Sequence, residues 1–598
     1  METSVKKSKV LRGGEFIIRE SKAEETFIKD EMNEEQSMFA NMTREFVNTR
    51  VMPNVPKIDK QDFELAVQLI NEAGELGILG ASLPTEYGGM GVDFNTEAIL
   101  SEELGMCHSL GVSIAAHTGI GTLPILYYGT EDHKKKYLPG LATGQLKAAY
   151  CLTEPGSGSD ALAAKTKAIL SDDGSHYVVT GQKMWITNGG FADMFIVFAQ
   201  VGGDKFTGFV VDAKSENINL GAEEDKMGIK GSSTRQVFFE GVKVPKENVL
   251  GEIGQGHRIA FNVLNIGRFK LCAMVMGGCK ASIGNATKYA NERIQFKVPI
   301  SSFGAIKHKI AEMAIRTYAV DAATYRTSGL ITDMISSLKA EGKSGWEAKL
   351  QAAEEYSIEC AMLKVFGSET LDYCVDEAVQ IYGGTGFSEE YPVARAYRDS
   401  RINRIFEGTN EINRLLTVDM LLKKALRGDL DLLSSAMAVQ KELMAIPDFG
   451  TNGDTALFHE EKKAIQNAKK AALVVAGAAV QKFQQKLQHE QEIIMYITDM
   501  LIDIFAAEST LLKTEKLAHL KSEEEASLQI DISKTFISDA LERIHQNGKS
   551  AVNGFAEGDE QRVMLMGIKR FTKYKPFNTI QARRRIADAI IKASDYCF

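Results

Sequence analysis

Apolar residues recur at helical spacing near the start of the chain, in a segment punctuated by glycines. Intervals of three and four residues separate Phe63, Val67, Ile70, Ala73 and Leu76. Because an α-helix turns once in about 3.6 residues, such positions fall on one face. The pattern predicts an N-terminal helical domain over residues 35–150, preceded by an extension over residues 1–34.

The character of the sequence changes after residue 150. Short apolar runs, among them Met194–Phe198, Phe209–Val211 and Val237–Phe239, alternate with Gly and Asp turns. Runs of this length between turn residues are typical of strands. We therefore expect a β domain, a barrel or a sandwich, over residues 151–256, and its length of about 100 residues is usual for a domain.

Helical periodicity returns after residue 256. Small residues cluster at Ala273, Gly277, Gly278 and Ala281, where they permit close helix packing. A four-helix bundle over residues 257–428 is the natural interpretation. Beyond a linker-like stretch at 448–454, an apolar stripe predicts more helix: Ile493, Ile497, Met500, Leu501, Ile504 and Phe505. Residues 429–598 therefore form an appended helical domain, and the fold class is α+β.

Composition fits a globular protein with about three or four domains. Of 598 residues, 44% are hydrophobic and 25% are charged. The net charge of −9, the scattered Lys and Arg and the presence of only two Trp argue against nucleic-acid binding. Seven cysteines without a CxxC pair and ten histidines without an HExxH motif indicate neither a disulfide framework nor a metal site.

The sequence carries no sign of secretion or of a membrane span. The first 20 residues are polar, mixed in charge and partly acidic, unlike a signal or transit peptide. The longest apolar run, Ala471–Val480, has about ten residues, against about 20 needed to cross a bilayer. We expect a cytoplasmic protein without a transmembrane helix.

One carboxylate stands where a catalyst could use it. In the segment Arg401–Ile412, Glu407 lies at a predicted junction between a loop and a helix. Gly408 allows close approach of a ligand, Thr409 or Asn410 can cap the helix, and the free N–H groups of its first turn suit a phosphate. Glu407 is the candidate base; the alternative is a surface glutamate stabilised by the helix dipole.

Two further segments could hold a flat ligand that carries phosphate. Cys151–Asp160 is a turn rich in Gly and Ser that could bind pyrophosphate or a flavin edge, or could be an ordinary loop. Trp185 and Thr187 lie on the same face of a predicted strand because they are two residues apart. An indole beside a flat cofactor is one use of Trp185, and a core tryptophan is the other.

These segments belong to a longer series with Gln380–Phe387, Tyr397–Asp399 and Phe406–Thr409. In this order the motifs resemble the acyl-CoA dehydrogenase family, and the resemblance covers about residues 35–425. The fold of that family, a helical domain, a β domain and a four-helix bundle, agrees with the domain order expected above. The appended helices, Phe303–Gly304 and Leu264–Phe269 resemble the very-long-chain branch in particular.

The resemblance implies an FAD enzyme and assigns its contacts by position. The residues that match FAD segments of the family are Leu152, Thr153, Ser159, Trp185, Thr187, Arg293, Phe296, Gln380, Gly383, Gly384, Thr409, Asn410 and Glu411. Substrate contacts are assigned to Ser159, Asn265, Arg268 and Gly408. The segments that begin at Arg293, Gln380 and Thr409 match segments that reach the FAD of the neighbouring subunit. If they cross between subunits here, FAD binding requires a homodimer.

The reaction that the resemblance implies is α,β-dehydrogenation of a fatty acyl-CoA to trans-2-enoyl-CoA, the first step of fatty acid β-oxidation. Glu407 would take the α proton with a pKa raised by desolvation, and Arg268 would oppose that rise. The Glu407 N–H would polarise the thioester carbonyl. Some relatives carry the base immediately before Arg268, but here that residue is Gly267. Electrons would pass to an electron-transfer flavoprotein.

Two positions depart from the family pattern. Gly304 stands where the family commonly has Gln, although the very-long-chain branch resembles the chain there. The segment His117–Pro124 lines the far end of the acyl tunnel in relatives. Gly121 matches a small residue of that branch, but Pro124 falls where another glycine is expected. The length and branching of the acyl group are therefore not predicted.

Two other functions share these features. An acyl-CoA oxidase would use the same fold, FAD and base but pass electrons to oxygen, and an assembly factor or scaffold would use the appended domain without chemistry. Very-long-chain relatives use C-terminal helices at membranes, and Ala471–Val480 has basic flanks. Two interpretations of this run therefore stand: a peripheral contact with the inner face of a membrane, or burial inside the protein.

Overall fold

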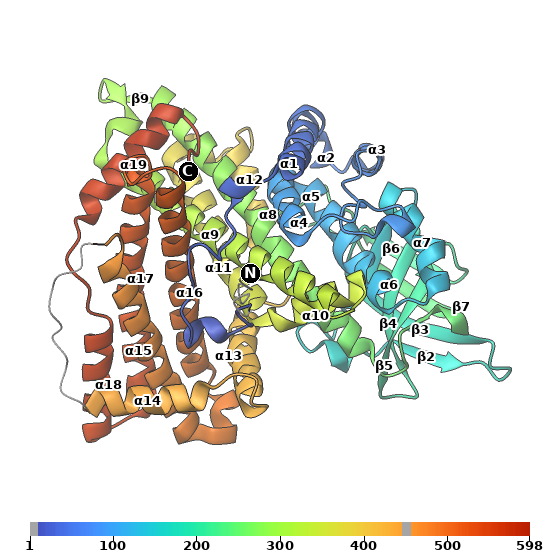
Figure 1. Cartoon of the computed structure of the whole chain (residues 1–598). Helices are drawn as coiled ribbons and strands as arrows, with labels where there is room; N and C mark the ends of the chain where they lie inside the picture. The colour runs from blue at the N-terminus through green and yellow to red at the C-terminus, as the bar shows by residue number, and fades with distance from the viewer. Residues whose placement is uncertain (1–9, 445–455) are drawn as a thin grey trace, which may run out of the picture.

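The computed structural model describes residues 10–444 and 456–598. The N-terminal helices and the sheet lie on one side of a set of long central helices, and the appended helices lie on the other side (Figure 1). The four predicted parts of the fold are therefore confirmed. The predicted linker at 448–454 lies outside the described residues.

The N-terminal domain is helical, as predicted. Its α-helices are α1 (Glu34–Phe46), α2 (Val55–Ile58), α3 (Phe63–Glu75), α4 (Phe94–Glu103), α5 (His108–Ala116), α6 (Leu123–Tyr128) and α7 (Glu131–Thr143). On α3, Ile70 and Ala73 of the predicted stripe are buried. Leu76 is 38% exposed, contrary to the pattern, because α3 ends at Glu75 and the chain turns away there.

The β domain is one mixed sheet with the strand order β6-β7-β3-β2-β4-β5-β8, in which β1 pairs with β4. The strands are β1 (Ala148–Cys151), β2 (Lys167–Leu170), β3 (His176–Thr187), β4 (Met194–Val201), β5 (Lys205–Asp212), β6 (Ile218–Glu223), β7 (Thr234–Pro245) and β8 (Val249–Leu250). The predicted run Met194–Phe198 is buried along its whole length, because alternate side chains pack into two different hydrophobic cores: Met194, Ile196 and Phe198 into one, Phe195 and Val197 into the other.

The bundle follows the sheet and contains the four long helices that the sequence predicts. Its helices are α8 (Gly256–Glu292), α9 (Gly304–Ala340), α10 (Gly345–Glu355), α11 (Ser357–Tyr382), α12 (Pro392–Ser400) and α13 (Asn410–Leu426), and a hairpin of β9 (Ile294–Gln295) and β10 (Val298–Pro299) joins α8 to α9. Helices α8, α9, α11 and α13 pack together and hold the small residues expected at their contacts. On α8, Ala273 and Gly277 are buried.

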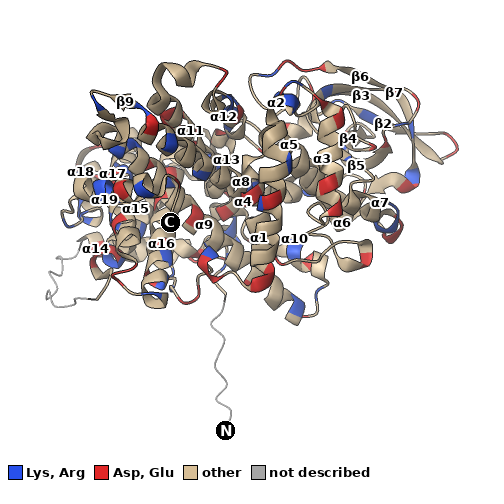
Figure 2. Cartoon of the chain, turned by 90° about the horizontal axis from the view of Figure 1, so that it is seen from above, with Lys and Arg blue, Asp and Glu red and all other residues tan. Residues whose placement is uncertain are grey.

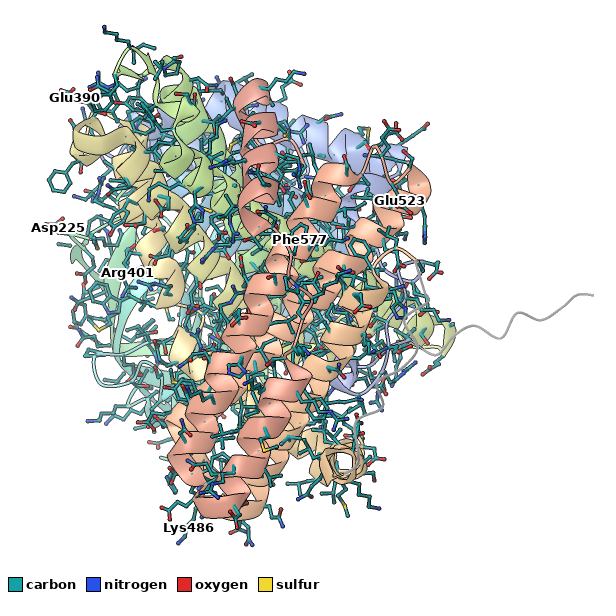
Figure 3. All side chains as sticks on the ribbon, turned by 90° about the vertical axis from the view of Figure 1, so that its left-hand side faces the viewer. Asp225, Glu390, Arg401, Lys486, Glu523 and Phe577 are labelled. Atoms are coloured by element: carbon teal, nitrogen blue, oxygen red, sulfur yellow. The ribbon has the colours of Figure 1, made fainter. Side chains whose placement is uncertain are left out.

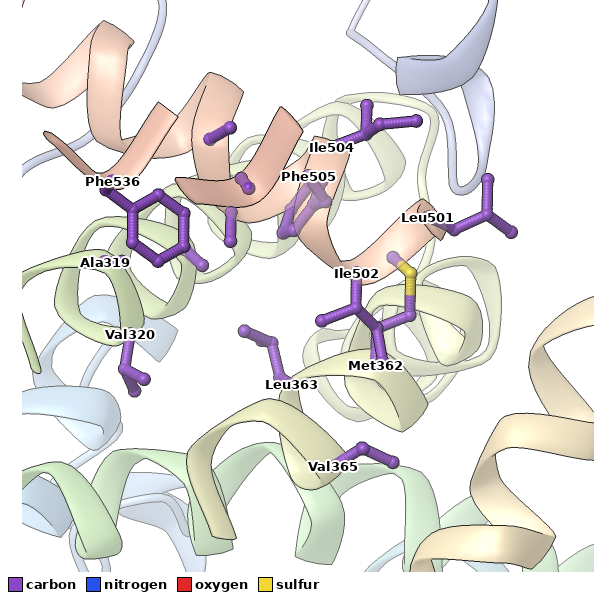
Figure 4. Packing of buried hydrophobic residues seen from close by; sticks show 14 of the residues in the cluster. Ala319, Val320, Met362, Leu363, Val365, Leu501, Ile502, Ile504, Phe505 and Phe536 are labelled. Carbon is purple, nitrogen blue, oxygen red and sulfur yellow. The ribbon is translucent and has the colours of Figure 1, made fainter. Parts of the chain in front are cut away.

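The appended helices share one hydrophobic core with the bundle. They are α14 (Leu432–Met444), α15 (His459–Phe483), α16 (Gln491–Leu520), α17 (Ser527–Phe555), α18 (Gly558–Phe571) and α19 (Thr579–Ala593). Figure 4 shows Ile502 and Phe505 of α16 above Met362 and Leu363 of α11. Every residue of the predicted stripe on α16 is buried, and Figure 3 looks directly onto these helices, with Lys486 at one end.

Three apolar segments bear on the question of membrane contact. The run Ala471–Val480 lies in α15, and none of its ten residues is exposed, so it contributes to the protein interior. Among the described residues, His108–Tyr128 and Gly256–Glu292 have the length and apolar content of a membrane span, but 78% and 67% of their apolar windows are buried inside the fold. Both are core helices by this measure. Charges of both signs are interspersed over the molecule (Figure 2).

Residues 10–31, which we call the N-terminal strap, cross the bundle and reach the appended helices. The Gly14 N–H donates to Glu359 Oε1 on α11 at 2.7 Å. Phe16 is fully buried and packs edge-on against Phe505 of α16, with 5.0 Å between ring centroids. Arg326 of α9 donates to Ser21 Oγ at 2.6 Å. The predicted extension is thus built into the contact between the bundle and the appended domain.

Candidate active site

A short loop before α13 carries the candidate base. Thr409 caps the helix, because its hydroxyl accepts a hydrogen bond from the Ile412 N–H at 3.2 Å. Glu407 and Gly408 have φ angles of 59° and 80°, in the left-handed region. Asn413 Nδ2 donates to the carbonyl oxygens of Glu407, Gly408 and Thr409 at 3.4, 2.8 and 3.0 Å. The helix that the loop precedes therefore holds its backbone in place.

The Glu407 carboxylate lies against α8. A Cβ at Gly267 would lie 2.7 Å from Glu407 Oε2. Within the described residues, this oxygen is buried and has no hydrogen-bond partner. Burial raises the pKa of Glu407 to about 7, and the positive charges of Arg268 and Lys364 oppose the rise. An unpaired carboxylate with a pKa near neutrality is suited to accept a proton from a ligand.

Arg268, the next residue on α8, contacts the same loop. Its Nε donates to the Glu407 carbonyl at 3.1 Å, and its Nη1 donates to Asn265 Oδ1 at 3.0 Å. The residue is only 5% exposed, so it is not a surface arginine. Burial lowers the pKa of Arg268, and the Glu407 carboxylate opposes that effect. Three of the predicted substrate residues, Asn265, Arg268 and Gly408, thus meet beside Glu407.

Sequence reasoning missed two groups at this site. Lys364 of α11 is fully buried and donates to the Gly408 carbonyl at 2.7 Å. The signal was a lone lysine in the apolar run 361–366. Tyr150 of β1 has a buried hydroxyl without a partner among the described residues, and burial together with the Glu407 charge raises its pKa well above the usual value. No local pattern marks Tyr150, because only the fold brings β1 to Glu407.

Trp185 and Thr187 lie at the end of β3, where a bulge interrupts the pairing with β7. Trp185 has a φ angle of 60°, and its side chain is 53% exposed. This excludes the alternative of a core tryptophan. Thr187, two residues further on, is partly buried. Strained backbone that presents an exposed indole is typical of a ligand site.

The Gly- and Ser-rich turn after β1 is anchored at its start and open at its tip. Lys183 Nζ donates to the Leu152 carbonyl at 3.1 Å, and the Met184 N–H donates to the Thr153 carbonyl at 3.0 Å. At the tip, Ser159 is exposed, and a Cβ added to Gly156 or Gly158 would have nothing within 4 Å. The turn therefore has the free backbone and the hydroxyl group that a phosphate or a flavin edge needs.

The remaining predicted cofactor residues divide into two sets. Arg293, Gln380, Gly383 and Gly384 are all exposed, and Phe296 at the hairpin tip is 88% exposed. Sixteen residues of α11 separate Gln380 from Lys364, which corresponds to about 24 Å along the helix. Within a single chain, Gln380 and its neighbours therefore lie far from Glu407. Exposure far from the base is what segments that serve a neighbouring subunit would show.

The second set is Thr409, Asn410 and Glu411 at the start of α13. The Asn410 side chain is buried and bonds inside the protein: its Oδ1 accepts from Lys364 Nζ at 2.8 Å, and its Nδ2 donates to Glu369 at 3.1 Å. Because the Asn410 side chain is occupied, a cofactor could contact this residue only through its backbone. Glu411 is exposed, and hydrogen bonds from the helix start lower its pKa.

A small cavity of about 40 Å³ lies beside α8 on the side of Gly267 toward Met274. Residues from α4, α5 and α8 line it, including Leu100, Ile114 and Met274, together with Thr118 in the turn after α5 and Ile78, Ala81 and Ser82 before α4. Gly121 packs closely on β1, because a Cβ there would lie 2.8 Å from Ala148 Cβ. Pro124 stands in the first turn of α6, where a missing N–H costs little. Neither Gly121 nor Pro124 by itself determines the length of the acyl group that the protein would accept.

The exposed indole of Trp185 and the open turn with its hydroxyl groups fit a dinucleotide with a flat ring system. Family models match the chain in four segments: the N-terminal domain of acyl-CoA dehydrogenase at 33–145, the middle domain at 149–242, and two C-terminal domain models at 254–422 and 467–570.

Similar proteins agree with these matches. A "Probable acyl-CoA dehydrogenase" of Bacillus subtilis (strain 168) is 46% identical over 99% of both chains. The mitochondrial very long-chain specific acyl-CoA dehydrogenase of Rattus norvegicus is 39% identical over 72% of this chain and 67% of its own. The crystal structure of an acyl-CoA dehydrogenase complexed with FAD from Bacillus anthracis superimposes with a TM-score of 0.96, at 45% identity, covering 98% of this chain and 100% of its own.

Proposed function

The chain belongs to the acyl-CoA dehydrogenase family of FAD enzymes, and we propose that it converts a fatty acyl-CoA to the trans-2-enoyl-CoA with Glu407 as the base that removes the α proton. This is the first step of fatty acid β-oxidation. The observation that carries the proposal is the buried, unpaired Glu407 Oε2 against Gly267.

The position of Glu407 suits proton abstraction from carbon. Its pKa of about 7, raised by burial, leaves an ionised fraction at neutral pH that still binds a proton well. General bases work best when their pKa lies near the operating pH. Because residue 267 is a glycine, the Glu407 carboxylate can lie close against α8. Gly267 also has no side chain that could act as a second base.

An α proton of a thioester becomes acidic only if the carbonyl oxygen is stabilised as negative charge develops on it. In the described part of the chain, the Glu407 N–H donates to no backbone acceptor, and it belongs to a loop whose backbone is held in the left-handed region. A fixed, free N–H of this kind is a donor for an enolate oxygen. We assign that role to Glu407, with Gly408 keeping side-chain atoms out of the way.

FAD, when bound, supplies the acceptor for the hydride that leaves the β carbon. Trp185, Thr187, Leu152, Thr153 and Ser159 would hold it beside Glu407. We further propose that electrons leave through an electron-transfer flavoprotein rather than through oxygen. The resemblance to dehydrogenases over the whole length supports this choice over an oxidase.

The experiment mixes the purified holoenzyme anaerobically with saturated straight-chain acyl-CoAs of increasing length. We expect loss of the flavin absorbance and formation of trans-2-enoyl-CoA, with an optimum that reports the depth of the tunnel. Failure with every length would contradict the proposed reaction. In a second arm, oxygen consumption without an added acceptor would identify an oxidase, and reduction of an electron-transfer flavoprotein would support the dehydrogenase.

A further inference from the structure

A buried lysine lies directly behind the loop of the base. Lys364 is fully buried in α11, and its Nζ donates to the Gly408 carbonyl at 2.7 Å and to Asn410 Oδ1 at 2.8 Å. Burial of an ammonium group is costly unless nearby groups compensate it. A methionine or leucine would fill this apolar part of α11 at lower cost, so the amine calls for an explanation.

The lysine faces charges on every element around it. Glu407 in the loop, Glu411 on α13 and Glu369 on α11 favour its positive form, and Arg268 on α8 opposes it. Burial lowers the pKa of Lys364 to about 7 despite the carboxylates.

The effect of the lysine on the base is reciprocal. The charge of Lys364 holds the pKa of Glu407 below the value that burial alone would give, together with Arg268. On the β1 side, Tyr150 also senses the Glu407 charge.

We propose that Lys364 is a positioning residue for Glu407: it fixes the loop through the Gly408 carbonyl, and its charge sets the pH at which the base ionises. This inference rests on the proposed role of Glu407 as the base. Lys364 neither gives nor takes the substrate proton. When Glu407 is ionised, the ammonium stabilises the negative carboxylate, and that stabilisation disappears when the carboxylate receives the α proton.

The acceptor of Lys364 is itself held by a polar chain that reaches the appended domain. Asn410 Nδ2 donates to Glu369 Oε1 at 3.1 Å, and Arg414 Nη1 donates to the same oxygen at 2.8 Å. Arg414 Nε in turn donates to Asp499 Oδ1 of α16 at 2.7 Å. Glu369, Arg414 and Asp499 line a cavity of about 230 Å³ between the bundle and the appended helices. Lys364 is therefore one end of a chain of polar contacts that runs from the loop of Glu407 to α16.

The test compares the variants Lys364→Met and Lys364→Arg with wild type as holoenzymes. The second-order rate constant for anaerobic flavin reduction is measured against pH, because it reports the ionisation of the base in the free enzyme. Exchange of the acyl-CoA α hydrogen with solvent deuterium gives a second readout of proton abstraction. Lys513→Met is the control: Lys513 is a buried lysine that pairs with Asp321, for which Lys280 remains a partner.

Loss of the positive charge in Lys364→Met raises the pKa of Glu407, so the midpoint of both profiles moves up by about one pH unit. Lys364→Arg stays charged above pH 7, where the lysine loses its proton, so its midpoint moves below that of wild type. Lys513→Met leaves the midpoint where it is. FAD content stays the same in all three variants.

An unmoved midpoint in Lys364→Met, with a rate lowered equally at every pH, overturns the proposal and leaves Lys364 a purely structural residue. If Lys364→Met does not fold, Lys364→Arg decides: a midpoint equal to or above that of wild type overturns it. Glu407→Gln separates the two claims. If that variant still reduces its flavin, the proposed base is wrong; if it does not and the Lys364 midpoints are unmoved, only the role of Lys364 fails.

Discussion

Glu407 is fixed through its backbone, while its carboxylate is left without a partner. Arg268 and Asn413 both donate to its carbonyl oxygen, whereas Oε2 is buried and unpaired within the described residues. The hydrogen bonds to the Glu407 carbonyl hold the residue in place, and Oε2 stays free to accept a proton because no cation in the described part of the chain pairs with it. This division is what a base aimed at a carbon acid requires, because a salt-bridged carboxylate would be too weak.

Glu407→Gln keeps the shape of this side chain and removes its capacity to accept the proton. We expect FAD to stay bound and the rate of flavin reduction by a saturated acyl-CoA to fall by about 10²- to 10⁴-fold. Anaerobic stopped-flow absorbance measures the rate. A Gln variant within about threefold of wild type, less than a typical general-base effect, would place the base elsewhere.

The raised pKa of Glu407 has opposite consequences for rate and for stability. Flavin reduction should rise with pH through about 7, because only the ionised carboxylate accepts a proton. The folded state binds this proton more tightly than the unfolded chain, whose ordinary value is 4.5, so the stabilising contribution is full below 4.5 and is lost as pH rises through about 7.

Glu407→Gln should therefore raise the Tm more at pH 8 than at pH 6, as differential scanning fluorimetry of the holoenzyme can measure. Glu523→Gln, at an exposed glutamate, is the control and should show no such difference. A Tm gain for Glu407→Gln that is equal at both pH values would contradict the burial of this carboxylate charge.

At the scale of elements, the site depends on how closely α8 approaches the loop before α13. Gly267 makes that approach possible, since a Cβ there would lie 2.7 Å from Glu407 Oε2. Gly267→Ala should displace the carboxylate and lower the rate of flavin reduction by about 10²-fold, the effect expected of a shift of about 1 Å, with FAD retained.

Gly304→Ala is the matched control for that variant. Gly304 also lies in a bundle helix, and a Cβ there meets nothing within 4 Å. Its rate should equal that of wild type. Equal rates in both glycine variants would show that the contact between α8 and the loop has no bearing on the chemistry.

Patterns that repeat along one element could be predicted from the sequence, and contacts made across elements could not. The stripe on α16 follows from helical periodicity, and the buried run of β4 follows from an unbroken apolar run between turn residues. The loop-to-helix junction at Glu407 follows from turn and capping residues. Lys364 and Tyr150 were missed because each looks ordinary in its own helix or strand. They acquire meaning only when α11 and β1 are brought to the loop. Turn composition and strand spacing had marked the Cys151–Asp160 turn and the pair Trp185 and Thr187 as a place for a flat ligand. Only the resemblance suggested the exposed set with Arg293 and Gln380 as cofactor contacts, which no spacing rule would have found.

At the scale of the whole molecule, the N-terminal strap ties the bundle to the appended domain. Phe16→Ala removes a fully buried ring from the contact with Phe505. We expect a loss of about 3–5 kcal/mol in the free energy of unfolding, seen as a fall in Tm. Leu433→Ala, at a side chain that is 72% exposed, should leave the Tm unchanged. Equal Tm values for both variants would mean that the strap is not held by its core contact.

The exposed residues that the resemblance assigns to FAD lead to a prediction about assembly. The appended helices cover an apolar face of the bundle, which leaves the hairpin with Phe296 free to meet a second copy. We expect a homodimer of 65.7 kDa chains by light scattering, and loss of both the dimer and FAD in Phe296→Asp. A stable tetramer would contradict the covering role of the appended helices. A monomer that keeps its FAD would contradict a cofactor site shared between subunits.

The N-terminal strap also sets an order of events during synthesis. Phe505, the ring that receives Phe16, is translated roughly 475 residues after the end of the strap. At elongation rates of about 5–20 residues per second, the nascent strap waits roughly 25 to 95 s for its partner. Its charged neighbours, such as Lys22, Glu24 and Glu25, keep it solvated meanwhile. The strap is therefore translated long before the ring that completes its packing, and its contact with the appended domain forms only after α16 has been made.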